Sequence, residues 1–211
     1  FLKESGDTPG TRKTFIYNTF EKLMKAISKS LKKNDPNHLN LGIRYGYIEQ
    51  LDDELLRISK ESFDALSFNC YALSPDHEKM NHALEISGLP MIIGEYHFGT
   101  VDRGLAQSLW QVNSQKERGD AFRYYTENAF AHRGLIGTGW FRWIDQNING
   151  RTDGENYNCG FIDVTDRPYP YMVDAAIETA KSLYEIHSGT KTPFHQAPNA
   201  VGHSPIPDLW E

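Results

Sequence analysis

A glutamate that follows an apolar run is the residue in this sequence best placed to do chemistry. The run 89–93 (LPMII) has the composition of a fully buried strand, and Gly94 and Glu95 follow it. Barrels of alternating strands and helices assemble their active sites from side chains at the carboxyl ends of the strands. Aromatic and hydrogen-bonding residues continue in the run 96–104 (YHFGTVDRG), and a sugar-binding cleft needs both kinds. We therefore interpret Glu95 as a catalytic carboxylate.

A second group of aromatic and polar residues follows a later apolar run. In the stretch 135–146 (LIGTGWFRWIDQ), Trp140 and Trp143 lie within a few residues of an acid and an amide. Indole rings stack on the apolar faces of sugars, while polar side chains hydrogen-bond to hydroxyl groups. The alternative is that Trp140, Phe141 and Trp143 all belong to the core. Because alternation along a strand cannot turn all three inward, we expect at least one tryptophan to line a cleft.

Strands and helices that could position these residues alternate along the chain. We predict them from the spacing of apolar residues and from breaks such as the run NDPN. The predicted strands cover 38–45, 63–71, 89–95 and 135–144. The predicted helices cover 14–31, 51–59, 75–86, 119–132 and a last segment around 173–184.

This alternation predicts an α/β fold with a parallel sheet and the helices outside it. Four strands can form a small open sheet, but here each strand ends in polar or aromatic residues, which would converge on one mouth in a barrel. A complete (β/α)8 TIM barrel has eight units over about 250 residues, so the chain contains roughly half of one. We assign 1–187 to this half barrel. The proline-containing segment 188–211 is predicted to be extended, either wrapping the surface or leading to another module.

The composition restricts the classes of partner. A formal net charge of −6 argues against nucleic-acid binding, and no apolar run is long enough to span a bilayer. The two cysteines, Cys70 and Cys159, lack the spacing of a zinc site. They are either two buried free thiols or a single disulfide. We expect no cofactor and no required metal.

Three stretches of the sequence resemble a known enzyme family. GEYHFGTVDRGL, NSQKERGDAFRYY and GWFRWIDQNINGRTDGENYNCGFIDVTDRPYP are similar to the C-terminal half of the barrel in glycoside hydrolase family 50, the β-agarases. The similarity runs from about residue 35 to residue 185. It implies that the four predicted strands are strands 5–8 of a (β/α)8 barrel. It also implies a hydrolase that cleaves β-linkages in a galactan such as agarose with retention of configuration.

The resemblance gives roles to residues at the strand ends. Glu95 matches the nucleophile, and Tyr71 matches a position whose hydroxyl hydrogen-bonds to that nucleophile. Retaining chemistry needs a second carboxyl about 5–5.5 Å away as acid and base. In these barrels that residue is a glutamate at the end of the fourth strand, which we expect upstream of Phe1, in the missing N-terminal half of the barrel.

The resemblance also implies substrate contacts at the strand ends and on the loops that follow. Arg44 either contacts the substrate or pairs with Glu95, and the two tryptophans are candidates for the floor of the subsite that holds the cleaved sugar. A less favoured role for Asp145 is the second carboxylate of an inverting enzyme, roughly 6.5–9.5 Å from the first. The complete substrate-binding set is Arg44, Asn69, His97, Asp102, Arg103, Trp140, Trp143, Asp145, Gln146, Glu155 and Asn156.

Two other functions remain open at this point. One is a non-catalytic, degenerate barrel that binds carbohydrate, and the other is a glycosidase of the same type that acts on porphyran or another β-galactoside. A polymeric substrate implies a secreted or periplasmic protein. Because a half barrel has two open sheet edges and an exposed apolar face, we also expect the chain alone to self-associate or to need its missing half.

Overall fold

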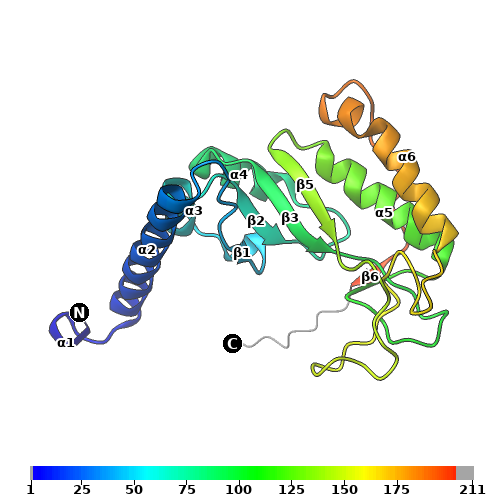
Figure 1. Cartoon of the computed structure of the whole chain (residues 1–211), viewed down its shortest axis with the longest axis horizontal. Helices are drawn as coiled ribbons and strands as arrows, with labels where there is room; N and C mark the ends of the chain where they lie inside the picture. Colours follow the sequence, from blue (N-terminus) through cyan, green and yellow to red (C-terminus); the bar gives the residue numbers. More distant parts are fainter. Residues whose placement is uncertain (1, 203–211) are drawn as a thin grey trace.

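The computed structural model describes residues 2–202 and contains one parallel sheet (Figure 1). Its strands lie in sequence order, β1-β2-β3-β5, and each neighbouring pair is parallel. The strands are β1 (Arg44–Tyr45), β2 (Leu66–Asn69), β3 (Met91–Tyr96) and β5 (Leu135–Trp140). This confirms the predicted α/β class with a parallel sheet.

Helices connect these strands and follow one another along the sheet, from α2 at one end to α6 at the other (Figure 1). They are α2 (Pro9–Asn34), α3 (Asp53–Ser62), α4 (His77–Ser87), α5 (Gln115–Phe130) and α6 (Pro170–His187). Shorter elements are α1 (Leu2–Ser5), the 3-10 turn η1 (Ile48–Gln50), β4 (Trp110–Gln111) and β6 (Val201–Gly202). Each of the five predicted helices is present.

Capping side chains set where the helices begin. Asp52 accepts the backbone N–H of Leu55 at the start of α3, at 3.1 Å. Ser114 caps α5 by accepting the N–H of Glu117 at 3.2 Å. That cap explains why α5 begins at Gln115, four residues before the predicted start, since a capped first turn needs no apolar residue.

The strands are shorter than the sequence suggests, and one is displaced. The segment 38–43 is irregular, which reduces the predicted strand 38–45 to the two residues of β1. β5 ends at Trp140, four residues before the predicted end. β3 continues through Gly94 and Glu95 to Tyr96, so Glu95 is part of the strand and does not follow it.

The sheet buries one face against the helices. In β2 and β3, Leu66, Phe68, Met91 and Ile93 have 0% of their surface exposed. The residues that alternate with them are only partly buried, which is how the two faces of a strand differ. This pattern directs the apolar residues to the core, and Asn69 and Glu95 lie outside that core.

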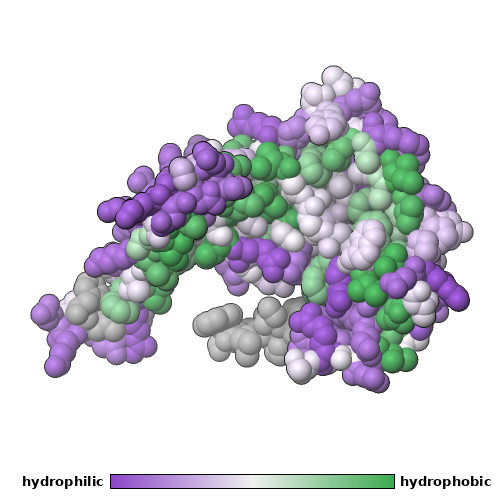
Figure 2. Space-filling view, viewed as in Figure 1, coloured by the Kyte–Doolittle hydropathy of each residue, from purple (hydrophilic) through white to green (hydrophobic). Residues whose placement is uncertain are grey.

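Apolar side chains remain exposed at both ends of the sheet. On α2, Ile16 is 60% exposed and Leu23 is 52% exposed, and Figure 2 shows hydrophobic surface along this helix. At the other end, Ile136 of β5 is 54% exposed and Tyr184 of α6 is 89% exposed.

The segment after α6 packs back onto the helices and strands that precede it. The backbone N–H of Phe194 donates to Glu127 at 2.7 Å, and Asn128 donates to the Phe194 carbonyl at 3.0 Å. β6 then pairs antiparallel with β4. The part of the predicted tail beyond Gly202 lies outside the described residues.

The structure also shows the state of the two cysteines and the character of the helices. Cys70 and Cys159 are both buried and both free, so the two-thiol alternative is correct. Across residues 2–202, none of the helices combines the length and the apolar character needed to cross a bilayer.

Candidate active site

Three donors from neighbouring strands hold the carboxylate of Glu95. Nη2 of Arg44 lies 2.8 Å from Oε1. The hydroxyl of Tyr71 donates to Oε2 at 2.9 Å, and Nδ2 of Asn69 donates to the same oxygen at 3.1 Å. Because β1, β2 and β3 are adjacent and parallel, their carboxyl ends bring these residues to one edge of the sheet. The Glu95 side chain keeps 20% of its surface exposed, so the carboxylate is held but reachable.

Gly94 provides the space that the ion pair needs. A Cβ at position 94 would lie 2.3 Å from Cδ of Arg44, which is far inside van der Waals contact. The stem of Arg44 therefore crosses the strand directly over Gly94 on its way to Glu95. A side chain at position 94 would therefore displace the stem of Arg44 from this path. Of the two roles considered for Arg44, pairing with Glu95 is present in the structure.

Tyr71 acts as a hydrogen-bond donor over a wide range of pH. The pKa of its phenol is raised above the ordinary value of 10.0, because burial disfavours the phenolate and the charge of Glu95 adds to the effect. The phenol therefore keeps its proton at neutral pH. Its ring meets the ring of His97 edge-on at a centroid distance of 5.0 Å.

His97 is buried, and both of its ring nitrogens have protein partners. Nε2 accepts the backbone N–H of Leu109 at 3.1 Å, so the proton of the neutral ring is on Nδ1, which donates to the carbonyl of Phe141 at 3.1 Å. Burial lowers the pKa of His97 to about 3. The expectation that His97 reaches substrate hydroxyls is wrong, since only 1% of its surface is exposed. It instead joins the loop after β3 to the end of β5.

The two tryptophans near the end of β5 have different environments. Trp140 donates its indole N–H to the carbonyl of Cys159 at 2.7 Å and packs edge-on against Tyr96. Trp143 is 67% exposed and stacks on Phe161 at 5.7 Å. Trp143 is therefore the tryptophan that presents an open face.

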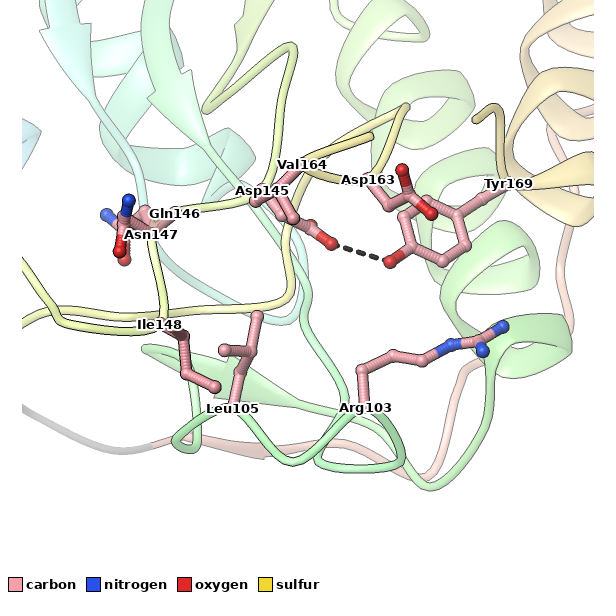
Figure 3. Close-up of a pocket in the computed structure, with 9 residues that line it drawn as sticks. All are labelled: Arg103, Leu105, Asp145, Gln146, Asn147, Ile148, Asp163, Val164 and Tyr169. Atoms are coloured by element: carbon pink, nitrogen blue, oxygen red, sulfur yellow. Dashed lines mark hydrogen bonds between the residues drawn. The ribbon is translucent and has the colours of Figure 1, made fainter. Parts of the chain in front are cut away.

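Asp145 lies below the surface and holds the last loop together. Its Oδ2 accepts a hydrogen bond from Tyr169 at 2.5 Å (Figure 3). Oδ2 also accepts one from Asn158 at 2.7 Å, and Oδ1 accepts the N–H of Gly160 at 2.7 Å. Only 5% of the residue is exposed. This arrangement gives Asp145 no role as the second carboxylate of an inverting enzyme.

Gln146 is enclosed in the same loop. Its Oε1 accepts the N–H of Tyr157 at 2.6 Å, and its Nε2 donates to Glu155 at 2.7 Å. With none of its surface exposed, Gln146 positions the loop through these two hydrogen bonds, and a direct contact with substrate stays a prediction. Asn156 also links loops, since its Oδ1 accepts the N–H of Ala106 at 3.2 Å.

The remaining predicted residues lie on the loop after β3. Oδ1 of Asp102 accepts a hydrogen bond from Gln115 at 2.7 Å and another from the hydroxyl of Thr100. The guanidinium of Arg103 lies 5.6 Å from the ring centre of Tyr169, at the start of α6. Neither residue contacts Glu95.

Two aromatic residues beside His97 were not predicted as site residues. The rings of Phe141 and Tyr157 lie 5.9 and 5.7 Å from the ring of His97, whose ring also contacts that of Tyr71. Phe141 directly follows β5, so its position at a strand end was a usable signal. Tyr157 lies 16 residues further along, and no local pattern marks it. Within residues 2–202, no group of three or more acidic, histidine or cysteine side chains is placed to hold a metal ion.

Comparison with known proteins identifies the relatives of this segment. No protein-family model matches the chain. Beta-agarase A of Vibrio sp. (strain JT0107) is 36% identical over 165 residues, which cover 75% of this chain and 16% of the relative. Beta-agarase B of the same strain is 34% identical over 170 residues, covering 77% and 17%. The chain is related to the β-agarases of glycoside hydrolase family 50.

Solved structures give the same relationship. The crystal structure of an agarase, AgWH50C, has a TM-score of 0.74 and 36% identity, covering 79% of this chain and 24% of that one. The resemblance seen in the sequence is therefore confirmed over most of the chain. The matched segment is short relative to its relatives, since this chain spans about a sixth of the length of the two curated β-agarases.

Proposed function

We propose that the protein is a retaining glycoside hydrolase that cleaves β-linkages in a galactan such as agarose, with Glu95 as the nucleophile. The observation that carries the proposal is the carboxylate of Glu95, held by three donors at the carboxyl ends of parallel strands. This geometry occurs in a chain that is about one-third identical to β-agarases.

The geometry around Glu95 suits a nucleophile. Attack by a carboxylate oxygen on the anomeric carbon forms a glycosyl–enzyme ester, and the leaving oxygen takes a proton from an acid. Water, deprotonated by the same group, then releases the sugar with its original configuration. The hydrogen bonds from Tyr71 and Asn69 both go to Oε2, and Arg44 pairs with Oε1. These contacts fix the direction of the carboxylate before the substrate arrives.

We further propose that the chain forms strands 5–8 of a (β/α)8 barrel and that the acid/base glutamate belongs to the other half. The exposed apolar residues of α2 and α6 support this, because they lie at the two ends of the sheet where further units would pack. A polymeric substrate also leads us to propose a secreted or periplasmic location.

The experiment compares the complete protein with its Glu95→Gln variant on agarose oligosaccharides. We expect Glu95→Gln to abolish turnover, since the amide keeps the shape of the side chain but is not a nucleophile. Glu178→Gln is the control, because Glu178 is an exposed residue of α6 whose carboxylate forms an ion pair with Lys181 on the same helix. The anomeric configuration of the first product, followed by NMR, tests retention.

Each result has a distinct meaning. Turnover that survives Glu95→Gln would show that the nucleophile is elsewhere. An inverted product would exclude the covalent mechanism. A wild-type protein that binds agarose without cleaving it would support the non-catalytic alternative, and cleavage confined to porphyran or another galactan would correct the substrate.

A further inference from the structure

A cavity of about 320 Å³ lies away from Glu95, between the loop after β3 and the loops after β5 (Figure 3). Arg103 and Leu105 line it from the loop after β3, and Ile148, Asp163 and Val164 line it from the loops after β5. The residues that hold the Glu95 carboxylate are not among those that line it. The cavity is therefore a separate feature of the same loop-bearing edge of the sheet.

The floor of this cavity is already assembled. Tyr169 is 6% exposed and donates to the buried Asp145 at 2.5 Å. The guanidinium of Arg118, which is fully buried, lies 4.4 Å from the ring centre of Tyr169, the residue before α6. A ligand would meet a preformed surface, and little ordering free energy would be lost on binding.

The rim of the cavity combines exposed apolar and polar side chains. Ile148 is 68% exposed and Val164 is 58% exposed, which is high for two aliphatic residues that line one pocket. Among the described residues, none accepts a hydrogen bond from the guanidinium of Arg103, whose one contact is with the Tyr169 ring. Asp163 holds its own turn through Oδ1, which accepts the N–H of Thr165 at 2.7 Å.

These groups indicate the chemistry of the ligand. One cation and one surface carboxylate flank the cavity, so a ligand with a net charge would meet a group of like sign. Aliphatic side chains beside a guanidinium and a carboxylate suit a neutral molecule with apolar faces and several hydroxyl groups. The volume lies at the lower end of the range for small-ligand sites, which favours a single ring over a long chain.

We propose that this pocket binds one pyranose unit of the polysaccharide chain, outside the place of cleavage. The choice of a polysaccharide rests on the proposed function. The loops that line the pocket follow β3, which contains Glu95, and the neighbouring strand β5. A second holding site there would increase affinity for long substrates and leave the chemistry on short ones unchanged.

The test uses the complete protein carrying Glu95→Gln, so that agarose is bound without being cut. Electrophoresis through gels with increasing agarose content measures the dissociation constant. Val164→Ser and Arg103→Leu are each expected to weaken binding by roughly fivefold. Val164→Ser removes apolar surface that the bound sugar would cover, and Arg103→Leu removes a pair of hydrogen bonds to its hydroxyl groups. Val101→Ser is the matched control, because Val101 is an exposed valine (46%) on the same loop as Arg103 that does not line the pocket.

A second measurement separates this inference from the proposed function. With Glu95 intact, Val164→Ser should leave the rate on a short oligosaccharide unchanged and lower the rate on polymeric agarose at subsaturating concentration. If the protein cleaves agarose but Val164→Ser binds it as tightly as Val101→Ser does, the pocket is not a sugar site and the proposed function stands. If the parent is neither retarded by agarose nor active on it, both proposals are wrong.

Discussion

The hydrogen bond from Tyr71 to Glu95 gives the most direct test of the site. Tyr71→Phe removes one oxygen atom and keeps the ring, whose edge-on contact with His97 at 5.0 Å should survive. The lost bond is 2.9 Å long and ends on a carboxylate oxygen that is mostly enclosed. The variant therefore isolates one interaction with the proposed nucleophile.

The size of the effect follows from the remaining contacts. A hydrogen bond to a charged group contributes about 1.5–3 kcal/mol, and about 1.4 kcal/mol corresponds to a factor of ten. Asn69 still donates to the same oxygen and Arg44 still pairs with the other one. We therefore expect the lower half of that range, a fall in kcat/KM of roughly tenfold to fortyfold.

The pH dependence of the loss is also fixed by the structure. Because the pKa of Tyr71 is raised above 10.0, its phenol stays protonated and keeps donating across the neutral range. The ratio of wild-type to variant kcat/KM should be constant between about pH 6 and pH 9. Initial rates on an agarose oligosaccharide, measured at several pH values, supply that ratio.

A matched tyrosine serves as the control for this experiment. Tyr45, in β1, is buried, and its hydroxyl lies 2.8 Å from that of Ser59. Tyr45→Phe should lower the free energy of unfolding by about 1 kcal/mol and leave kcat/KM unchanged. Equal kcat/KM values for Tyr71→Phe and wild type would refute the argument that this bond orients the nucleophile.

Two further predictions concern stability. The pKa of His97 is lowered to about 3 by burial, so below its ordinary 6.5 the unfolded chain binds a proton that the folded chain does not. As the pH is lowered from 6.5 to about 3, this group should therefore reduce the free energy of unfolding by up to about 1.4 kcal/mol per pH unit. Urea titrations of His97→Asn over the same pH range should show a smaller reduction. In β5, an alanine Cβ at Gly139 would lie 2.6 Å from the carbonyl oxygen of Gly94, whereas at Gly137 the nearest atom is a side-chain carbon at 3.6 Å. Gly139→Ala should destabilise the protein by about 1–3 kcal/mol in calorimetry, and a Gly137→Ala variant of equal loss would contradict the steric argument.

The order of the elements was accessible from the sequence because apolar periodicity is a local property. Buried strands carry alternating apolar residues, and the core residues Leu66, Phe68, Met91 and Ile93 have that spacing. The position of Glu95 at the end of such a run was enough to mark it. Of the partners of its carboxylate, Tyr71 was expected from the family resemblance and Arg44 was one of two alternatives, whereas Asn69 was predicted only to bind substrate.

The ends of the elements were less accessible because other interactions decide them. α5 starts early because Ser114 caps it, and a cap has no apolar signature. β1 is only two residues long although the segment before it contains Leu39, Leu41 and Ile43, all of which are exposed. An apolar segment forms a strand only where a partner strand can pair with it.

The sequence by itself determined the α/β class, the family relationship and the identity of the candidate nucleophile, since each depends on residue types within a short window. Only the tertiary structure decided which polar residues face solvent and which hold loops together. His97 finds its partners 12 and 44 residues away, and Asp145 finds one 24 residues away. A buried polar group must be satisfied by whatever the fold brings to it, and that choice is made by contacts far apart in the chain.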